Sequence, residues 1–184
     1  MLRRATFRDY PAMLQIYAPY VEQTTVSAEY FVPSPATFSA RMEALKNKSP
    51  VLVCEEGGEI LGYAYLAPAF ERRAFSWDCD LSVYVRRDAR GRGIGTKLEG
   101  ACARIARELG YRRIYALVTG GNGASIEFHK RMGYRITAEF PEALFKQGRW
   151  MSLIWLEKEV NAPECAASFP RPLSALPAHL WEEL

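Results

Sequence analysis

The residues best suited to chemistry lie in the stretch RGRGIGT at residues 90–96, where two arginines and three glycines precede an amphipathic segment. If a helix begins near Gly93, its first amide groups lack intrahelical partners and, together with the helix dipole, attract an anion. Glycines let the backbone approach phosphate oxygens, and guanidinium groups add charge-assisted contacts that suit a pyrophosphate. The stretch therefore predicts a phosphate-binding turn made of Arg90, Gly91, Arg92, Gly93, Ile94, Gly95 and Thr96.

Other interpretations of an arginine–glycine turn fit this stretch less well. The P-loop spacing G-x-x-x-x-G-K-[S/T] does not occur here. A dinucleotide-binding fingerprint needs a glycine where Thr96 stands, and arginine–glycine segments that bind RNA are usually disordered repeats. A solvated turn without a ligand is the alternative that the stretch alone leaves open.

The elements around the turn follow from hydrophobic periodicity. Helices are predicted from Asp9 to about Pro19, from Ser34 or Ser39 to about residue 48, from Gly93 to Gly110, and over residues 122–133. Strands are predicted at residues 1–7, 51–56, 59–68, 74–85, 112–118, 134–140 and 149–160. The order β α α β β β α β α β β predicts an α/β fold in which helices cover a mixed sheet.

Composition limits the classes of function. The chain has 184 residues, and its 24 basic and 21 acidic residues leave a charge of +3, too small an excess to indicate a nucleic-acid partner. No run of 18 apolar residues predicts a membrane span. Two histidines cannot form a histidine-rich metal site, so no metal is expected. No C-x-x-C pair occurs, and scattered cysteines are typical of reduced thiols in a cytoplasmic protein; they are Cys54, Cys79, Cys102 and Cys165.

The last part of the chain differs in character. Residues 161–184 contain four prolines and predict a Pro-rich C-terminal extension appended to a single domain at residues 1–160. Apolar side chains could place this extension against the domain or against a partner chain, and a partly ordered extension is equally compatible. These side chains belong to Leu173, Leu176, Leu180, Trp181 and Leu184.

Two motifs together resemble the GNAT superfamily of acyl-CoA-dependent N-acetyltransferases. The pattern [Q/R]-x-x-G-x-[G/A] at a strand-to-helix turn is matched at residues 90–95. The pattern N-x-x-[A/S]-x-x-[F/L]-[Y/H]-x-x-x-G-[F/Y] is matched from Asn122 to Tyr134, about 30 residues later. Further stretches at residues 62–77, 80–85 and 146–158 resemble the phosphinothricin and methionine sulfone (sulfoximine) acetyltransferase branch.

The resemblance implies a GNAT fold, whose mixed, mostly antiparallel sheet is splayed at the cofactor site and flanked by about four helices. Acetyl-CoA would lie between two central parallel strands, with its pyrophosphate at the turn formed by residues 90–96. The resemblance also implies contacts with the cofactor arm from Ser82, Val83, Tyr84, Val85, Asn122, Ser125 and Phe128.

The resemblance also implies catalytic and acceptor-binding roles. The phosphinothricin branch carries a glutamate where Asp80 stands, which implies that Asp80 is the general base. His129 would be its partner, or the acid that protonates the leaving thiolate. A free amino acid would need a cation for its carboxylate, and the residues implied in acceptor binding are Arg72, Arg73, Phe75 and Arg149.

We therefore expect direct acetyl transfer from acetyl-CoA to the α-amine of a small amino-acid-like acceptor of the phosphinothricin or methionine sulfone type. The family also implies a homodimer. Two alternatives stay open at this point: an acetyltransferase for a protein N-terminus, a polyamine or a drug amine, and a non-catalytic acyl-CoA-binding module. Nucleic-acid and membrane partners are not expected.

Overall fold

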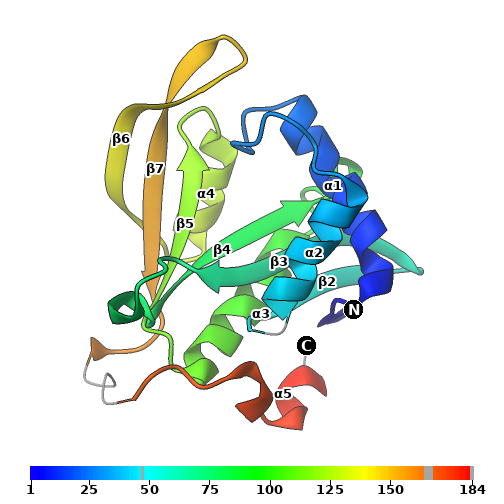
Figure 1. Ribbon diagram of the computed structural model, residues 1–184, viewed down its shortest axis with the longest axis vertical. Helices are drawn as coiled ribbons and strands as arrows, with labels where there is room; N and C mark the ends of the chain where they lie inside the picture. The colour runs from blue at the N-terminus through cyan, green and yellow to red at the C-terminus, as the bar shows by residue number, and fades with distance from the viewer. Residues whose placement is uncertain (47, 164–167, 183–184) are drawn as a thin grey trace.

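The computed structural model describes residues 1–46, 48–163 and 168–182. Within these residues, seven strands form one sheet in the order β1-β2-β3-β4-β5-β7-β6 (Figure 1). Strands β4 and β5 are parallel, and every other neighbouring pair is antiparallel. The strands are β1 (Leu2–Arg4), β2 (Val51–Glu56), β3 (Glu59–Pro68), β4 (Asp78–Val85), β5 (Arg113–Thr119), β6 (Arg135–Lys146) and β7 (Arg149–Glu159).

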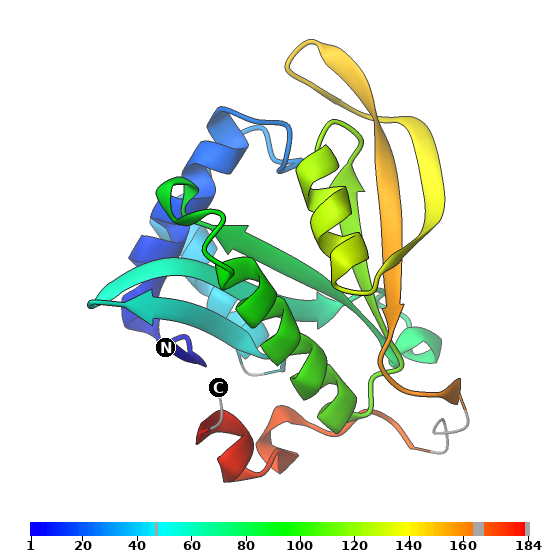
Figure 2. The same ribbon diagram turned by 180° about the vertical axis from the view of Figure 1, so that it is seen from behind.

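Helices cover both faces of the sheet. The helices α1 (Tyr10–Glu22) and α2 (Pro35–Lys46) lie on one face, and α3 (Ile94–Leu109) and α4 (Gly123–Arg131) lie on the other (Figures 1 and 2). The element order agrees with the periodicity of the sequence. No helix in the described part of the chain is long and apolar enough to cross a membrane.

The helix ends follow from local sequence. Ser34 precedes α2 and its hydroxyl accepts a hydrogen bond from the amide of Thr37, which decides between the two predicted starts. Gly110 ends α3 in the left-handed conformation at φ 88°. The turn between β2 and β3 has Gly57 and Gly58 at φ 60° and 84°, as a two-residue hairpin with twisted strands requires.

The predicted boundaries of four elements were wrong. Strand β1 ends at Arg4 instead of residue 7, and strand β6 continues to Lys146 instead of ending at residue 140. Helix α1 continues past Pro19 to Glu22, because burial of Tyr20 and Val21 in the core offsets the ~3 kcal/mol that an interior proline costs. Strand β4 begins at Asp78 instead of residue 74, because residues 73–75 form a 3-10 turn that the hydroxyl of Ser76 closes on a backbone carbonyl.

The core has one apolar cluster on each face of the sheet. Helix α3 buries Leu98, Ile105 and Leu109 on one face, and α1 buries Met13 with neighbouring aromatic side chains on the other. The cluster under α3 also contains three side chains of the C-terminal extension, which are Leu173, Leu176 and Leu180.

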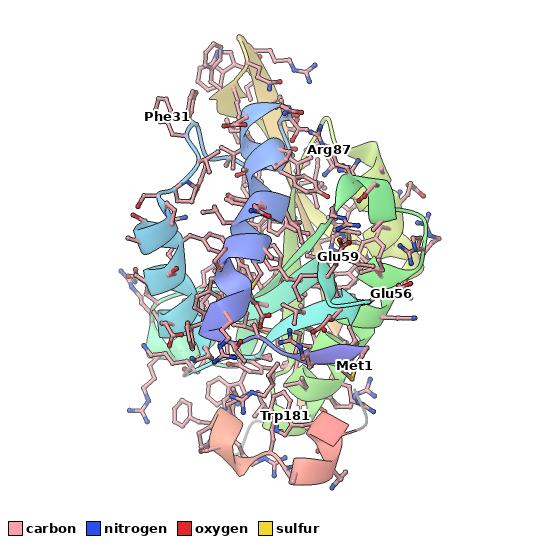
Figure 3. The ribbon with its side chains drawn as sticks, turned by 90° about the vertical axis from the view of Figure 1, so that its right-hand side faces the viewer. Met1, Phe31, Glu56, Glu59, Arg87 and Trp181 are labelled. Carbon is pink, nitrogen blue, oxygen red and sulfur yellow. The ribbon has the colours of Figure 1, made fainter. Side chains whose placement is uncertain are left out.

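The extension packs on the domain beside the N-terminal strand. Its last helix is α5 (Ala178–Glu182), and the guanidinium of Arg4 lies 4.7 Å from the ring centre of Trp181. Figure 3 shows Trp181 at the same end of the molecule as Met1. The sequence-based expectations also included Cys165 and Leu184, which lie outside the described residues. The domain boundary at residue 160 stays a prediction.

Candidate active site

The parallel strands β4 and β5 separate part-way along their length. They are paired at only three positions, and the last pair joins Asp80 to Tyr115. Beyond this pair β4 continues to Val85 and β5 to Thr119, and Figure 1 shows these ends pointing apart. One edge of β4 therefore lacks a neighbouring strand after Asp80.

Hydrogen bonds at the other edge of β4 show which backbone groups face this gap. The amide of Arg86 donates to the carbonyl of Leu61 at 2.8 Å, and the amide of Ala69 donates to that of Asp78 at 3.3 Å. Antiparallel pairing alternates along a strand, so the even-numbered residues of β4 bond to β3. The amide and carbonyl groups of the odd-numbered residues from 81 to 85 consequently face the gap.

This alternation refines the predicted set of strand contacts. Val83 and Val85 present backbone groups to the gap, whereas Ser82 and Tyr84 present theirs to β3. Leu81 faces the gap as well, and the sequence analysis missed it. A ligand that lies along β4 can therefore reach alternate residues only.

Asp80 lies at the point of separation. Its carboxylate is largely buried, and Oδ1 has no hydrogen-bond partner among the described residues. Burial raises the pKa of Asp80 to about 6, against the opposing effect of a backbone hydrogen bond. Such a carboxylate is mostly ionised at pH 7, yet it accepts a proton more readily than an ordinary aspartate.

The predicted phosphate-binding turn has the conformation that its glycines allow. Gly91 and Gly93 have φ angles of 77° and 76°, and no atom lies within 4 Å of the position of an added Cβ at either residue. Backbone conformation, and not crowding, therefore requires glycine at both positions. The first bond into α3 joins the amide of Lys97 to the carbonyl of Gly93 at 3.1 Å, which leaves the amides of residues 94–96 without a backbone acceptor in the described chain.

The two arginines of the turn differ in their surroundings. Arg92 binds both carboxylate oxygens of Glu56, at 2.7 and 2.8 Å. Arg90 makes no ion pair among the described residues, and its guanidinium lies 5.1 Å from the ring centre of Tyr20. The hydroxyl of Tyr20 donates to the carbonyl of Val85 at the end of β4. Arg90 is thus the cation of the turn that is available to an anion.

The arginines just before the turn are occupied by other contacts. Arg86 binds Glu59 at 2.8 Å and Asp88 at 2.7 Å, and Arg87 donates to the side chain of Gln23 at 2.6 Å. Figure 3 shows Arg87 and Glu59 on one side of the molecule. These contacts tie the turn to the β2–β3 hairpin and to α1.

The second motif meets the first in space. The side chain of Asn122 accepts a hydrogen bond from the amide of Ser125 at 3.3 Å and so begins α4. The ring of Phe128 lies 3.4 Å from the position of an added Cβ on Gly95. The helices that start at the two motifs therefore touch beside the turn.

His129 is buried in α4, with 6% of its surface exposed. Its Nδ1 lies 2.8 Å from the carbonyl of Ser125, and because a carbonyl only accepts, Nδ1 carries the hydrogen. Its Nε2 is buried without a partner among the described residues. Burial lowers the pKa of His129, against the opposing effect of the bond to Ser125, so the imidazole is neutral at pH 7.

The structure does not bring Asp80 and His129 together. Asp80 shares a face of β4 with Tyr84, which packs in the cluster under α1. His129 belongs to α4 on the opposite face, against Tyr134. Among the described residues no hydrogen bond or ion pair joins the two side chains.

The proposed acceptor-binding cations also lie apart. A guanidinium nitrogen of Arg149 lies 3.6 Å from the position of an added Cβ on Gly121, close to Thr25. Arg73 instead lies over the ring of Phe169 in the C-terminal extension, 4.4 Å from its centre. Arg149 and Arg73 are therefore not neighbours.

The separation follows from the register of the sheet. Arg72 and Arg73 precede Trp77, whose carbonyl accepts from the amide of Arg113, and Arg113 is paired with Glu159 at the far end of β7. Arg149 begins that strand, about 30 Å away at ~3.3 Å per residue. One carboxylate cannot reach the cations at both ends of the strand.

Phe75 belongs to an aromatic layer beside the proposed base. Its ring centre lies 4.7 Å from that of Phe70, which contacts Tyr115 at 6.1 Å and Trp155 at 5.8 Å. Tyr115 is the strand neighbour of Asp80. The layer thus forms an apolar wall next to the carboxylate.

Residues 2–155 match the family described as acetyltransferase (GNAT) domain, which spans nearly the whole sheet and both motifs. The chain belongs to the GNAT acetyltransferase family. It is accordingly an acetyl-CoA-dependent N-acetyltransferase with a GNAT fold, as the two motifs predicted.

Curated and solved relatives of this GNAT domain agree on the fold. An L-methionine sulfoximine/L-methionine sulfone acetyltransferase of Pseudomonas paraeruginosa is 33% identical over 167 residues, covering 90% of this chain and 97% of that protein. A phosphinothricin N-acetyltransferase of Alcaligenes faecalis is 35% identical, covering 84% and 79%. The crystal structure of a phosphinothricin acetyltransferase from Sinorhizobium meliloti in complex with AcCoA superposes with a TM-score of 0.86 at 28% identity, covering 92% of each chain.

The GNAT domain presents groups that fit acetyl-CoA. The unpaired edge of β4 offers amide and carbonyl groups to an extended pantetheine chain, and the free amides of residues 94–96 suit a diphosphate. Arg90 adds a charge next to those amides. Among the described residues no group of three His, Cys, Asp or Glu side chains is placed to hold a metal ion.

Proposed function

We propose that this acetyltransferase acts on the α-amine of a small amino-acid-like acceptor of the methionine sulfoximine, methionine sulfone or phosphinothricin type. The observation that carries the proposal is the buried, unpartnered carboxylate of Asp80 at the point where β4 and β5 separate. The names of the relatives support the acceptor class. Acetyl-CoA supplies the acetyl group as a thioester.

We assign the binding of acetyl-CoA to the odd-numbered backbone groups of β4 and to the turn at residues 90–96. The pantetheine arm is held along the unpaired strand edge, and the free amides of the turn with Arg90 hold the diphosphate. Arg92 contributes less, because Glu56 already balances its charge. Asn122 and Ser125 form the N-terminal cap of α4, and Phe128 packs α4 against the start of α3; these contacts shape this side of the site.

Asp80 is assigned as the general base. The pKa of a peptide α-amine is near 8, and the carboxylate of a free amino acid raises the pKa of its α-amine further. More than nine-tenths of the acceptor is therefore protonated at pH 7, and a proton must leave before or during attack. With a pKa raised to about 6, the Asp80 carboxylate is available at pH 7 to take that proton. Oδ1 is buried without a hydrogen-bond partner among the described residues, so a proton taken from the amine would not displace an existing bond of this atom.

His129 has a narrower role in this proposal than the family resemblance implied. Its Nδ1 hydrogen is used by Ser125, and its Nε2 can only accept while the ring is neutral. Burial disfavours the imidazolium that would protonate a thiolate. We therefore assign proton abstraction to Asp80 and leave Nε2 of His129 as a hydrogen-bond acceptor beside the cofactor.

Arg72 and Arg73 are assigned to the acceptor carboxylate, because the α-amine and the carboxylate of an amino acid share one carbon and the cation must lie near the base. Asp80 pairs with Tyr115, and Tyr115 pairs with Glu157, which is two residues from the end of β7 near these arginines and eight residues from Arg149. The aromatic layer with Phe75 forms the apolar side of the acceptor site. Arg149, which the resemblance also implied, lies beside the loop that follows β5 and is the weaker candidate within one chain.

Two further expectations remain proposals. A homodimer is supported by apolar side chains on the sheet face of β5, β6 and β7 that carries Trp155, where Leu117 and Phe140 are 45% and 48% exposed. A cytoplasmic location is compatible with the buried free thiols of Cys54 and Cys79.

One assay tests the proposed function. Release of CoA is measured for a panel of amino acids, peptides, polyamines and drug amines, with wild-type protein and with Asp80→Asn. We expect wild type to acetylate amino-acid acceptors. In the variant, this turnover should fall by about 10²–10⁴ while CoA affinity stays unchanged. Turnover confined to peptides or polyamines would reject the acceptor class, and full activity of the variant would reject the base.

A further inference from the structure

Lys146 is a buried lysine at the end of β6 that the transfer reaction does not use. It is 4% exposed, although its neighbours in the β6–β7 hairpin are exposed. Its Nζ donates to the carbonyl of Val21 at 2.8 Å and to that of Ser27 at 2.7 Å. A buried ammonium is costly unless it is hydrogen-bonded, so these two contacts define its position.

The two carbonyl groups that Lys146 binds lie in the last turn of α1 and in the loop that follows it. Val21 lies in the last turn of α1, where carbonyl groups lack intrahelical partners. Ser27 lies in residues 23–34, which connect α1 to α2 and are called the α1–α2 loop below. Lys146 therefore joins the β6–β7 hairpin to this loop across 119 residues of sequence.

The α1–α2 loop contacts residues that adjoin each of the separated strands. The hydroxyl of Ser27 lies 2.6 Å from that of Tyr17, whose ring centre is 4.9 Å from that of Tyr84 on β4. The hydroxyl of Thr25 lies 3.6 Å from the position of an added Cβ on Gly121, which follows β5. The loop thus spans the open end of the gap, on the face of β4 that carries Asp80.

A second contact joins the loop to the hairpin. The hydroxyl of Tyr30 donates to the carbonyl of Phe145, next to Lys146. Figure 3 shows Phe31 at the outer side of the loop, and it is 85% exposed. Arg149 follows Lys146 by three residues, so one clamp sets the positions of both the loop and Arg149.

We propose that Lys146 is a positioning residue for the acceptor amine, because it holds the α1–α2 loop on the β6–β7 hairpin across the gap between β4 and β5. The inference rests on the function proposed above, which places the acceptor amine at Asp80. Lys146 touches no reacting atom. The cofactor site at residues 90–96 belongs to α3 and receives no contact from Lys146 among the described residues.

Steady-state kinetics test this role. Lys146→Met removes two charge-assisted hydrogen bonds, and we expect the KM for the amine to rise at least ~10-fold while the KM for acetyl-CoA changes less than ~2-fold. Lys146→Cys should behave in the same way and regain affinity for the amine after treatment with 2-bromoethylamine, which rebuilds the ammonium group. Wild type under the same treatment is the control for native cysteines, and Lys48→Met is the control for loss of a lysine charge at an exposed site.

Hydrogen exchange of the α1–α2 loop gives a readout that does not depend on activity. Amides of residues 23–30 should exchange faster in Lys146→Met, and those of α3 should not. If wild type acetylates no amine and the loop still exchanges faster in Lys146→Met, the proposed function fails. The role of Lys146 in holding the loop then stands. Equal changes in both KM values, or no change in exchange, would overturn the clamp.

A second variant covers the case in which Lys146→Met does not fold. Tyr30→Phe removes only the exposed hydroxyl contact with Phe145. It should raise the KM for the amine about 2- to 5-fold and speed exchange in the same loop. An unchanged KM with unchanged exchange in this variant would also contradict the proposal.

Discussion

Asp80 and Tyr115 form the last pair of residues that joins β4 to β5 before these parallel strands separate. The same position therefore ends the shared hydrogen bonding of the sheet and presents a buried carboxylate with a raised pKa. A cofactor held along the free edge of β4 would pass directly beside this carboxylate. The geometry of the sheet would thus bring the proposed base and the proposed cofactor site together.

The buried carboxylate of Asp80 should reduce the stability of the fold. Its pKa rises from an ordinary value of 3.8 to about 6 in the folded chain, so the folded state binds more protons between these values. The contribution of Asp80 to stability is then most favourable below about pH 4 and falls by about 3 kcal/mol as the pH rises through 6. Asp80→Asn should therefore be more stable than wild type by about 2–3 kcal/mol at pH 7.5 and similar at pH 4.

Urea unfolding at both pH values checks this expectation. Asp88→Asn, which changes an exposed carboxylate, is the matched control and should lack the pH-dependent gain. A variant at Asp80 that is less stable than wild type at pH 7.5 would show that its charge is compensated in the fold.

Gly93 should be required for conformation at the cofactor turn. An L-residue at φ 76° costs about 1–2 kcal/mol, so Gly93→Ala should lower the unfolding free energy by that amount and weaken CoA binding. Gly100→Ala in α3 is the matched control, because space is open there and alanine should stabilise the helix by about 0.5–1 kcal/mol. Thermal unfolding measures the change in stability, and calorimetry with CoA measures the change in affinity. Equal stability and equal CoA affinity in the two variants would contradict the assignment of residues 90–96 as the cofactor turn.

The two arginines of the turn should contribute unequally to CoA affinity. Arg90→Ala removes an uncompensated charge and should weaken CoA binding about 10- to 100-fold. Arg92→Ala removes a guanidinium that Glu56 already binds. This substitution should weaken CoA binding less than about 3-fold. Calorimetry at two salt concentrations separates the charge effect, and the reverse order of the two variants would be inconsistent with the observed pairing.

Arg72 should select acceptors that carry a carboxylate. Arg72→Met should raise the KM for an amino acid about 10- to 100-fold and leave the KM for the corresponding amino amide nearly unchanged. Arg149→Met, at the other end of β7, should change neither KM selectively. The comparison of acid and amide in the same variants provides the check, and a stronger effect at Arg149 would move the carboxylate site to that end, within the chain or across a dimer.

Local features of the site could be predicted from the sequence because neighbouring residues determine them. The left-handed glycines of the turn, the cap at Asn122 and the end of α3 at Gly110 each follow from a short pattern. The resemblance to the GNAT family then placed the cofactor along β4. Period-two alternation would also have indicated Leu81 as a residue of the unpaired edge.

Long-range relationships could not be predicted in the same way. The faces on which Asp80 and His129 lie depend on how α4 packs over β5, and the distance from Arg73 to Arg149 depends on the register of β7. Lys146 gave no signal, because a lysine near an exposed hairpin tip is ordinarily solvated. Its partners lie 119 and 125 residues away in the sequence.

The most direct test of the account is the pH dependence of kcat/KM for the amine in wild type and in Asp80→Asn. With Asp80 as the base, the slope of log kcat/KM against pH should decrease by about one unit as the pH rises through about 6 in wild type. The variant should be slower at every pH and lack this break. A break at the same pH in the variant would contradict Asp80 as the proton acceptor.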